Sequence, residues 1–195
     1  MLSLVLVLAT QAPADSGPRI AASSFASVEV HINSRPIGGQ WYAEDASLQG
    51  PARIAIHYGQ PHARGRKIEG GLIPVDTVWR FGANEATILH TDVDLTLGTL
   101  KVPRGDYSLF LLNGKTGWDL IVNHGTGQWG TDYDAKKDVG RVRLTSKTSP
   151  ANEESLSIYL VPQSGNPRTG YATLGGVLRI KWGTTELATN WTVDK

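Results

Sequence analysis

The residues best suited to chemistry gather between positions 57 and 87, where the chain reads HYGQPHARGRKIEGGLIPVDTVWRFGANEAT. Arg64, Arg66 and Lys67 flank Gly65 within this stretch. Guanidinium forks and open backbone N–H groups in such a loop can bind a carboxylate or a phosphate. The alternative is that these charges are solvated, or that one arginine stacks on Trp79 at the edge of the core. We expect an anion-binding loop or a solvated one.

The block from position 79 to position 85, Trp-Arg-Phe-Gly-Ala-Asn-Glu, is the second candidate. In a functional interpretation, Arg80, Asn84 and Glu85 line a pocket at one end of the fold. In a structural interpretation, the tryptophan and alanine lie in the core, the glycine permits a kink, and the asparagine closes a turn through its side chain. The sequence leaves both open.

A metal site is the third candidate. His57 and His62 lie five positions apart, and His90, Asp92 and Asp94 alternate along a predicted strand. Alternation would place these last three on one side of that strand. Zinc accepts such nitrogen and oxygen ligands, but no His-Glu-x-x-His or His-x-His motif brings them together. We therefore expect no bound metal and no cofactor.

The sequence contains no recognisable nucleophile with its base. No Gly-x-Ser-x-Gly elbow is present, and no Ser-His-Asp set stands out from its spacing. Carboxylate pairs such as Asp92 with Asp94, or Glu69 with Glu85, would serve hydrolysis only at a fixed separation. The sequence favours a non-catalytic protein and keeps a metal-dependent or carboxylate-dependent hydrolase as an alternative.

Six tryptophans raise the question of a stacking surface for a sugar or other ligand. Trp118, Trp182 and Trp191 lie on alternating runs, where an aromatic side chain belongs to the core. Trp41 and Trp129 stand among glycines and polar residues. We expect these two at the surface.

Composition excludes two further classes. Nineteen Lys and Arg oppose 18 Asp and Glu, so the formal charge is +1. A near-neutral chain lacks the basic field that nucleic acids attract, and we expect no nucleic-acid partner. The absence of cysteine excludes disulfides and thiolate metal sites.

Apolar residues recur every second position along most of the chain, which is typical of half-buried strands. Val28, Val30 and Ile32 alternate with polar residues, and positions 107–112 are apolar on both faces, as in a covered central strand. The other runs cover positions 54–58, 92–97, 118–122, 139–144, 156–161, 177–182 and 187–193. The pattern predicts an all-β, mainly antiparallel, jelly-roll-like sandwich of about nine to ten strands. We expect short helical turns at most, in 41–50 or 130–138.

The chain divides into a signal-like segment with a linker, residues 1–24, and a single β-sandwich domain, residues 25–195. Positions 2–9 read LSLVLVLA, and small residues follow, with cleavage expected after Ala12 or Ala14. No Lys or Arg precedes the apolar run, and the run is too short to span a bilayer. We expect an extracytoplasmic protein, periplasmic or secreted, with membrane association only through this segment and no transmembrane helix.

Several blocks together resemble the DUF2911 family, a family of exported bacterial proteins of unknown function. The blocks are Gly65-Arg66, 70–74, 78–80, 82–87, 105–109, 118–123, 128–131 and Asp138. The resemblance implies export and a β-rich domain, and it implies no reaction. The missing positive charge before the apolar run departs from the family pattern. Residues 34–50, longer and more aromatic than expected, are a second departure.

Taken together, these features predict a non-catalytic envelope module that binds a protein partner or serves as an accessory subunit of a membrane-bound assembly. The alternative is a protein that binds a small ligand, a carbohydrate or an anion. Its tentative binding residues are Arg64, Arg66, Arg80, Asn84, Glu85 and Trp129.

Overall fold

The computed structural model describes residues 17–43, 51–163 and 174–194. The predicted signal-like run at positions 2–9 lies outside these residues. Within them the chain forms thirteen strands and one short 3₁₀ helix, η1 (Ala135–Lys137). No helix in this part of the chain has the length and apolar character to cross a membrane.

The larger sheet is antiparallel throughout and has the strand order β1-β4-β6-β9-β10-β11, with β5 pairing β9 beside this path. Its strands are β1 (Ser23–Ile32), β4 (Ala52–Pro61), β5 (Val78–Trp79), β6 (Thr87–Thr91), β9 (Gly105–Gly114), β10 (Gly117–Asn123) and β11 (Asp138–Arg143). The hairpin β9–β10 lies within this sheet, between β6 and β11.

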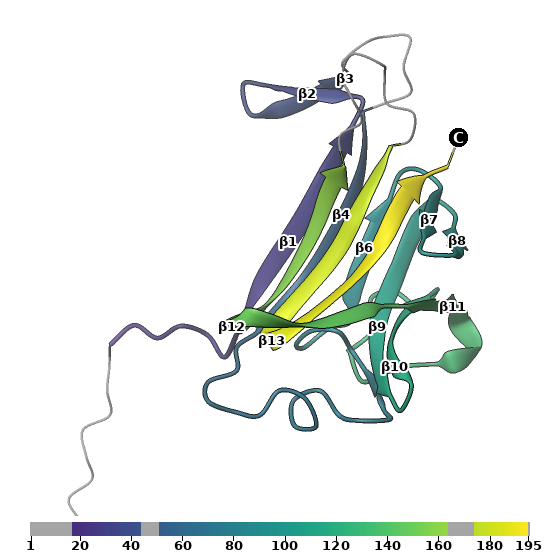
Figure 1. Cartoon of the computed structure of the whole chain (residues 1–195). Helices are drawn as coiled ribbons and strands as arrows, with labels where there is room; N and C mark the ends of the chain where they lie inside the picture. The colour runs from purple at the N-terminus through teal and green to yellow at the C-terminus, as the bar shows by residue number, and fades with distance from the viewer. Residues whose placement is uncertain (1–16, 44–50, 164–173, 195) are drawn as a thin grey trace, which may run out of the picture.

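The second sheet has the order β12-β13-β7-β8 and packs across the first (Figure 1). Its strands are β12 (Thr145–Gln163), β13 (Gly175–Val193), β7 (Leu95–Leu97) and β8 (Leu100–Val102). A separate hairpin, β2 (Ser34–Ile37) with β3 (Gln40–Ala43), projects beyond the sandwich at the end of β1.

The alternation of apolar and polar residues along the strands explains which side chains form the core. Ile54, Ile56 and Tyr58 of β4 are buried and face the same interior as Leu178 and Ile180 of β13. Strand β9 is buried on both faces, because Phe110 packs on its outer side with Ile121 and Tyr133. The all-β sandwich predicted from the sequence is therefore confirmed, as is the central strand that is covered on both faces.

Two details differ from the pattern. The run predicted at 92–97 does not begin a strand until Leu95, because the Thr91 hydroxyl bonds both the carbonyl and the N–H of Val93 and turns the chain out of β6. The two last predicted runs are one strand, β13, which bends at Gly183, where φ is +58°. The helical turn expected in 130–138 is η1.

The segment between β4 and β5 positions the candidate site. It is folded on itself by backbone hydrogen bonds: the N–H groups of Leu72 and Ile73 donate to the carbonyls of Lys67 and Ile68, and Gly70 donates to Ile73. Gly65 and Gly70 adopt left-handed backbone angles at its turns. The loop is therefore an ordered part of the sandwich end rather than an open connection.

Candidate functional site

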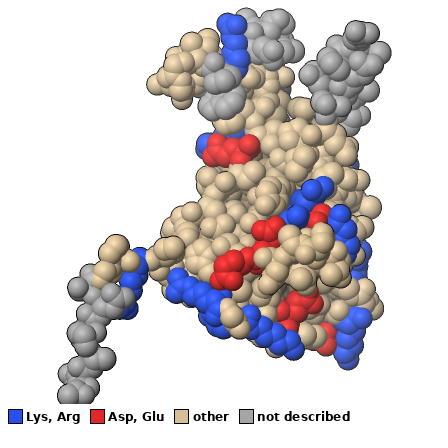
Figure 2. Space-filling view, turned by 60° about the vertical axis from the view of Figure 1, so that its left-hand side comes forward, with Lys and Arg blue, Asp and Glu red and all other residues tan. Residues whose placement is uncertain are grey.

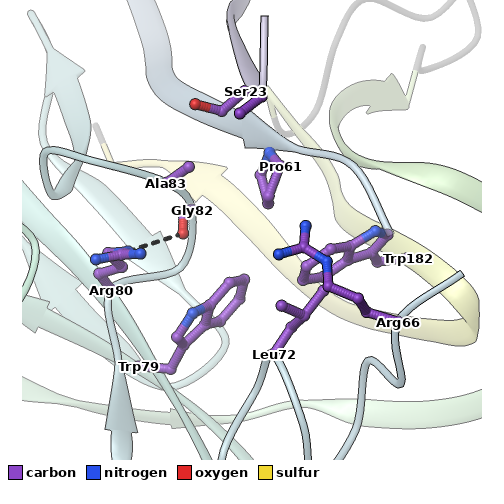
Figure 3. Close-up of a pocket in the computed structure, with 10 residues that line it drawn as sticks. Ser23, Pro61, Arg66, Leu72, Trp79, Arg80, Gly82, Ala83 and Trp182 are labelled. Carbon is purple, nitrogen blue, oxygen red and sulfur yellow. Dashed lines mark hydrogen bonds between the residues drawn. The ribbon is translucent and has the colours of Figure 1, made fainter. Parts of the chain in front are cut away.

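A cavity of about 190 Å³ opens where the β4–β5 loop, the start of β1 and the bend of β13 meet. Figure 3 shows most of its lining side chains converging on one space. The lining residues are Ala22, Ser23, Pro61, Arg66, Leu72, Trp79, Arg80, Gly82, Ala83 and Trp182. Most are apolar, and two are arginines. No Asp or Glu is among these lining residues.

Two stacked indoles form one wall. The rings of Trp79 and Trp182 have centroids 5.8 Å apart and an interplanar angle of 18°. Trp79 belongs to β5 of the larger sheet and Trp182 to β13 of the smaller one, so the stack joins the two sheets. The Trp182 indole N–H donates to the Glu154 carbonyl at 3.1 Å, which fixes the ring. This wall is rigid and apolar.

Arg66 reaches the cavity from the β4–β5 loop. Its Nε donates to the Ala63 carbonyl at 3.1 Å, and one terminal nitrogen donates to the His62 carbonyl at 2.8 Å. In Figure 3 its guanidinium points into the space between Pro61 and Trp79. Carbonyl dipoles orient the group without removing its charge.

Arg80 approaches from the opposite side. Its Nε donates to the Gly82 carbonyl at 3.2 Å, the bond drawn in Figure 3. The aliphatic part of its side chain packs against Gly130, where any Cβ would overlap the Arg80 side chain. Arg80 is only partly exposed. The side chain is therefore held in place by packing and by one carbonyl.

Neither guanidinium has a carboxylate partner in the part of the chain that the structure describes. The ion pairs found there involve other arginines, such as Arg53, Arg141, Arg143 and Arg179. Arg80 is partly buried and Arg66 is exposed, and the charge of each attracts an anion that reaches the cavity. The cavity thus combines an apolar body with two unneutralised cations, an arrangement suited to a carboxylate on an apolar group.

The turn at 82–85 closes the cavity beside β1. Asn84 has a φ of +64°, which asparagine tolerates, and its Nδ2 donates to the Ser23 hydroxyl at 3.0 Å. The Ala83 N–H donates to the Gly59 carbonyl at 2.9 Å, and a Cβ at Gly59 would overlap the Ala83 backbone. The Asn84 side chain therefore joins this turn to β1 behind the cavity wall instead of closing the turn on itself.

Besides Asn84, three predicted binding residues do not line the cavity. Arg64 donates to the Ile20 and Ala21 carbonyls and ties the segment before β1 to the loop. Glu85 forms a backbone bridge with Trp129, whose side chain is 51% exposed. The structure thus brings together Arg66 and Arg80 of the predicted set. The side chain of Trp41, the other predicted surface aromatic, lies outside the described part.

The histidine candidates have structural partners. His62 lies 2.7 Å from the Ser155 hydroxyl and 3.1 Å from that of Ser24. His90 lies between Asp106 and Asp92, at 2.8 and 3.0 Å. Among the described residues, no group of three or more His, Cys, Asp or Glu side chains is placed to hold a metal ion.

Sequence reasoning missed the apolar part of the site. Trp182 was expected in the core, and it is 3% exposed, yet its remaining edge lines the cavity. No motif in the sequence singles out Pro61, Leu72 or Ser23, because each is an ordinary residue in a strand or loop. The register between β1 and β4 pairs Ser23 with Pro61, and the folded β4–β5 loop adds Leu72. No local pattern carried that signal.

The surrounding surface carries charges of both signs. In Figure 2, Lys and Arg side chains line the lower edge of the molecule, the end where Figure 1 places the β4–β5 loop, and acidic side chains form a band above them. No broad field of one sign covers this face.

Comparisons with known proteins give a single result. A family model described as a protein of unknown function, DUF2911, matches residues 43–190, well over half of the chain and including most of the cavity. No curated protein and no solved structure matches the chain.

Proposed function

This chain belongs to the DUF2911 family, whose description names no activity, and from the geometry of its own cavity we propose that it binds a small carboxylate with an apolar body. The observation that carries the proposal is the pair Arg66 and Arg80. Both line a cavity walled by Trp79 and Trp182, and neither has a described carboxylate partner. A bound carboxylate would supply the missing negative charge, while the indoles would take its apolar part.

Preorganisation strengthens this proposal. The Arg66 guanidinium is already oriented by two carbonyls, and Arg80 is packed against Gly130. Binding would therefore order few additional rotamers, which preserves affinity.

Calorimetric titration with benzoate tests the proposal, with benzamide as a neutral probe of nearly the same shape. We expect benzoate to bind more tightly than benzamide, and we expect Arg66→Gln or Arg80→Gln to weaken benzoate binding about tenfold each. Arg104→Gln is the control, because Arg104 is exposed and lies outside the cavity lining. Equal affinity for the two probes, absence of benzoate binding, or an equal loss in the control variant would overturn the proposal.

A second candidate function, docking on a protein partner, is favoured by apolar side chains near the start of β1. Phe25 is 76% exposed and Ile20 is 80% exposed. Strand β1 also forms an edge of the larger sheet, with β4 as its hydrogen-bonded neighbour. An exposed edge strand with apolar side chains can pair with another chain.

Affinity purification from the envelope of the source cells tests this second function. We expect a protein that co-purifies with the wild type to be lost from the Phe25→Ser variant and retained by Val75→Ser, a control at another exposed apolar residue. Identical protein sets from all three would remove this candidate.

Both functions fit an exported protein, and export is part of the proposal. The apolar run at 2–9, followed by small residues, supports processing after Ala12 or Ala14. Cell fractionation with intact-mass measurement tests it. A cytoplasmic protein that retains Met1 would contradict it.

A further inference from the structure

A second cavity, of about 260 Å³, adjoins the first. Arg66 and Trp182 line both cavities, so the two spaces meet at these side chains. The rest of the second lining comes from the β4–β5 loop, from β12 and from the bend of β13, including Lys67, Asn152 and Thr184. The two cavities are therefore neighbours that share the side chains of Arg66 and Trp182.

The charges along this site do not balance. Arg80 lines the first cavity, Arg66 lines both, and Lys67 lines the second. Glu69 is the one carboxylate among these lining residues, and it accepts a hydrogen bond from the Thr185 hydroxyl. Three cations against one carboxylate leave two positive charges. An occupant with two negative charges would neutralise them.

Lys67 is the cation of the second cavity that could receive the second charge. It has no ion pair with any described carboxylate, Glu69 included, whereas other lysines such as Lys101 and Lys147 do. The backbone of Lys67 is fixed, because its carbonyl accepts the Leu72 N–H at 3.0 Å and a Cβ at Gly71 would overlap that carbonyl. The side chain therefore extends from a fixed backbone, with its ammonium beside Gly70.

The path between the charged ends is apolar. Trp182 borders both cavities, and Ile68 lines the second beside it. Gly183 allows this approach, since a Cβ there would lie 2.8 Å from the Ile68 Cδ1 atom. A ligand that crosses from one cavity to the other would thus contact hydrocarbon and an indole edge between its charges.

On the premise that the first cavity binds a carboxylate, we propose that the ligand is an elongated dianion, an α,ω-dicarboxylate with an apolar spacer. One carboxylate lies between Arg66 and Arg80, the spacer passes Trp182, and the second carboxylate meets Lys67. The chain length at which the second carboxylate reaches Lys67 sets the selectivity of the site.

Calorimetric titration with two matched series tests this inference: saturated α,ω-dicarboxylates of increasing length, and monocarboxylates with the same numbers of carbons. We expect one range of dicarboxylate lengths to bind about tenfold more tightly than the matched monocarboxylate. Lys67→Gln should abolish that advantage and leave monocarboxylate affinity unchanged. Lys115→Gln, at an exposed lysine outside both linings, is the control.

The outcomes separate the two proposals. Monocarboxylate binding that depends on Arg66 and Arg80, with no dicarboxylate advantage at any length, overturns the dianion inference and leaves the proposed function in place. An advantage that survives Lys67→Gln also overturns it. If neither series binds, both proposals are wrong.

Discussion

Three cations on β12 and β13 surround a single buried carboxylate, whereas Arg66 and Arg80 at the cavity have backbone carbonyls as their described partners. Glu186, whose side chain is 7% exposed, lies 3.2 Å from Lys147, 3.2 Å from Arg179 and 3.7 Å from Lys181. Both regions concentrate positive charge on this nearly neutral chain. They differ in what balances it.

The difference separates a structural role from a binding role. At Glu186 one buried carboxylate is within ion-pair distance of all three cations, so the energy of these contacts contributes to folding. At the cavity the anion is missing from the described residues, so the corresponding energy is available for binding. A count of arginines and lysines along the sequence cannot distinguish the two cases.

The largest expected effect comes from removing the internal anion. Glu186→Gln keeps the shape of the side chain and leaves three cations facing one another, so we expect the free energy of unfolding to fall by about 2 kcal/mol. Urea denaturation measures it. Glu85→Gln is the matched control, because Glu85 is exposed and has no ion pair among the described residues, and it should have almost no effect. If the free energy of unfolding of Glu186→Gln equals that of the wild type, the cluster does not stabilise the fold.

The pH dependence of the stability lost in Glu186→Gln tests the same comparison between the Glu186 cluster and the cavity. Burial raises the pKa of Glu186, but the hydrogen bond from Lys147 and the charges of Lys147, Arg179 and Lys181 outweigh burial, so the pKa lies below its ordinary value of 4.5. A carboxylate with a lowered folded-state pKa gives stability that is full above the unfolded-state pKa and is lost as the pH falls through the folded-state pKa.

The stability gap between the wild type and Glu186→Gln should therefore be constant above pH 4.5 and shrink below it. Urea denaturation at a series of pH values measures the gap. A gap that widens on acidification would show that the favourable partners do not dominate at Glu186.

A matched pair of charge removals probes the two regions directly. Arg179→Met removes one cation from the Glu186 cluster and should cost about 1 kcal/mol. Arg80→Met keeps the packing stem beside Gly130 and removes an unneutralised charge, so its unfolding free energy should stay within about 0.5 kcal/mol of the wild type, or rise. Equal losses in the two variants would mean that Arg80 also has a structural counter-ion.

The sequence predicted the fold far better than it predicted the site. Two-residue alternation is a local property, and it identified the faces of β1, β4 and β9 because each strand buries one face in the main core. Strand β9 buries its other face in a second apolar cluster. The boundary at Thr91 was missed because a side-chain hydrogen bond, which alternation does not encode, ends β6 there.

The site depends on contacts between distant segments. Arg66 and Arg80 were identified by residue type, but Trp182 lies more than a hundred positions away and meets Trp79 only because β13 bends at Gly183. Arg64 looked equivalent to Arg66 in the sequence, yet its guanidinium holds the Ile20 and Ala21 carbonyls. Glu186 drew no attention, since its three partners come from two strands paired only in the folded chain.

The smallest expected effect concerns Trp129, which residue type alone had suggested as a stacking surface. Its side chain is 51% exposed and does not line either cavity, while the neighbouring Gly130 supports Arg80 through its backbone. Trp129→Ser should therefore change the unfolding free energy by no more than about 0.5 kcal/mol. Benzoate affinity should stay within about twofold of the wild type, because the contacts of Arg66 and Arg80 are retained. Urea denaturation and calorimetry measure the two quantities. A tenfold loss of affinity with unchanged stability would place the indole over the bound ligand, and an aromatic side chain would then join the cations that distinguish the cavity from the Glu186 cluster.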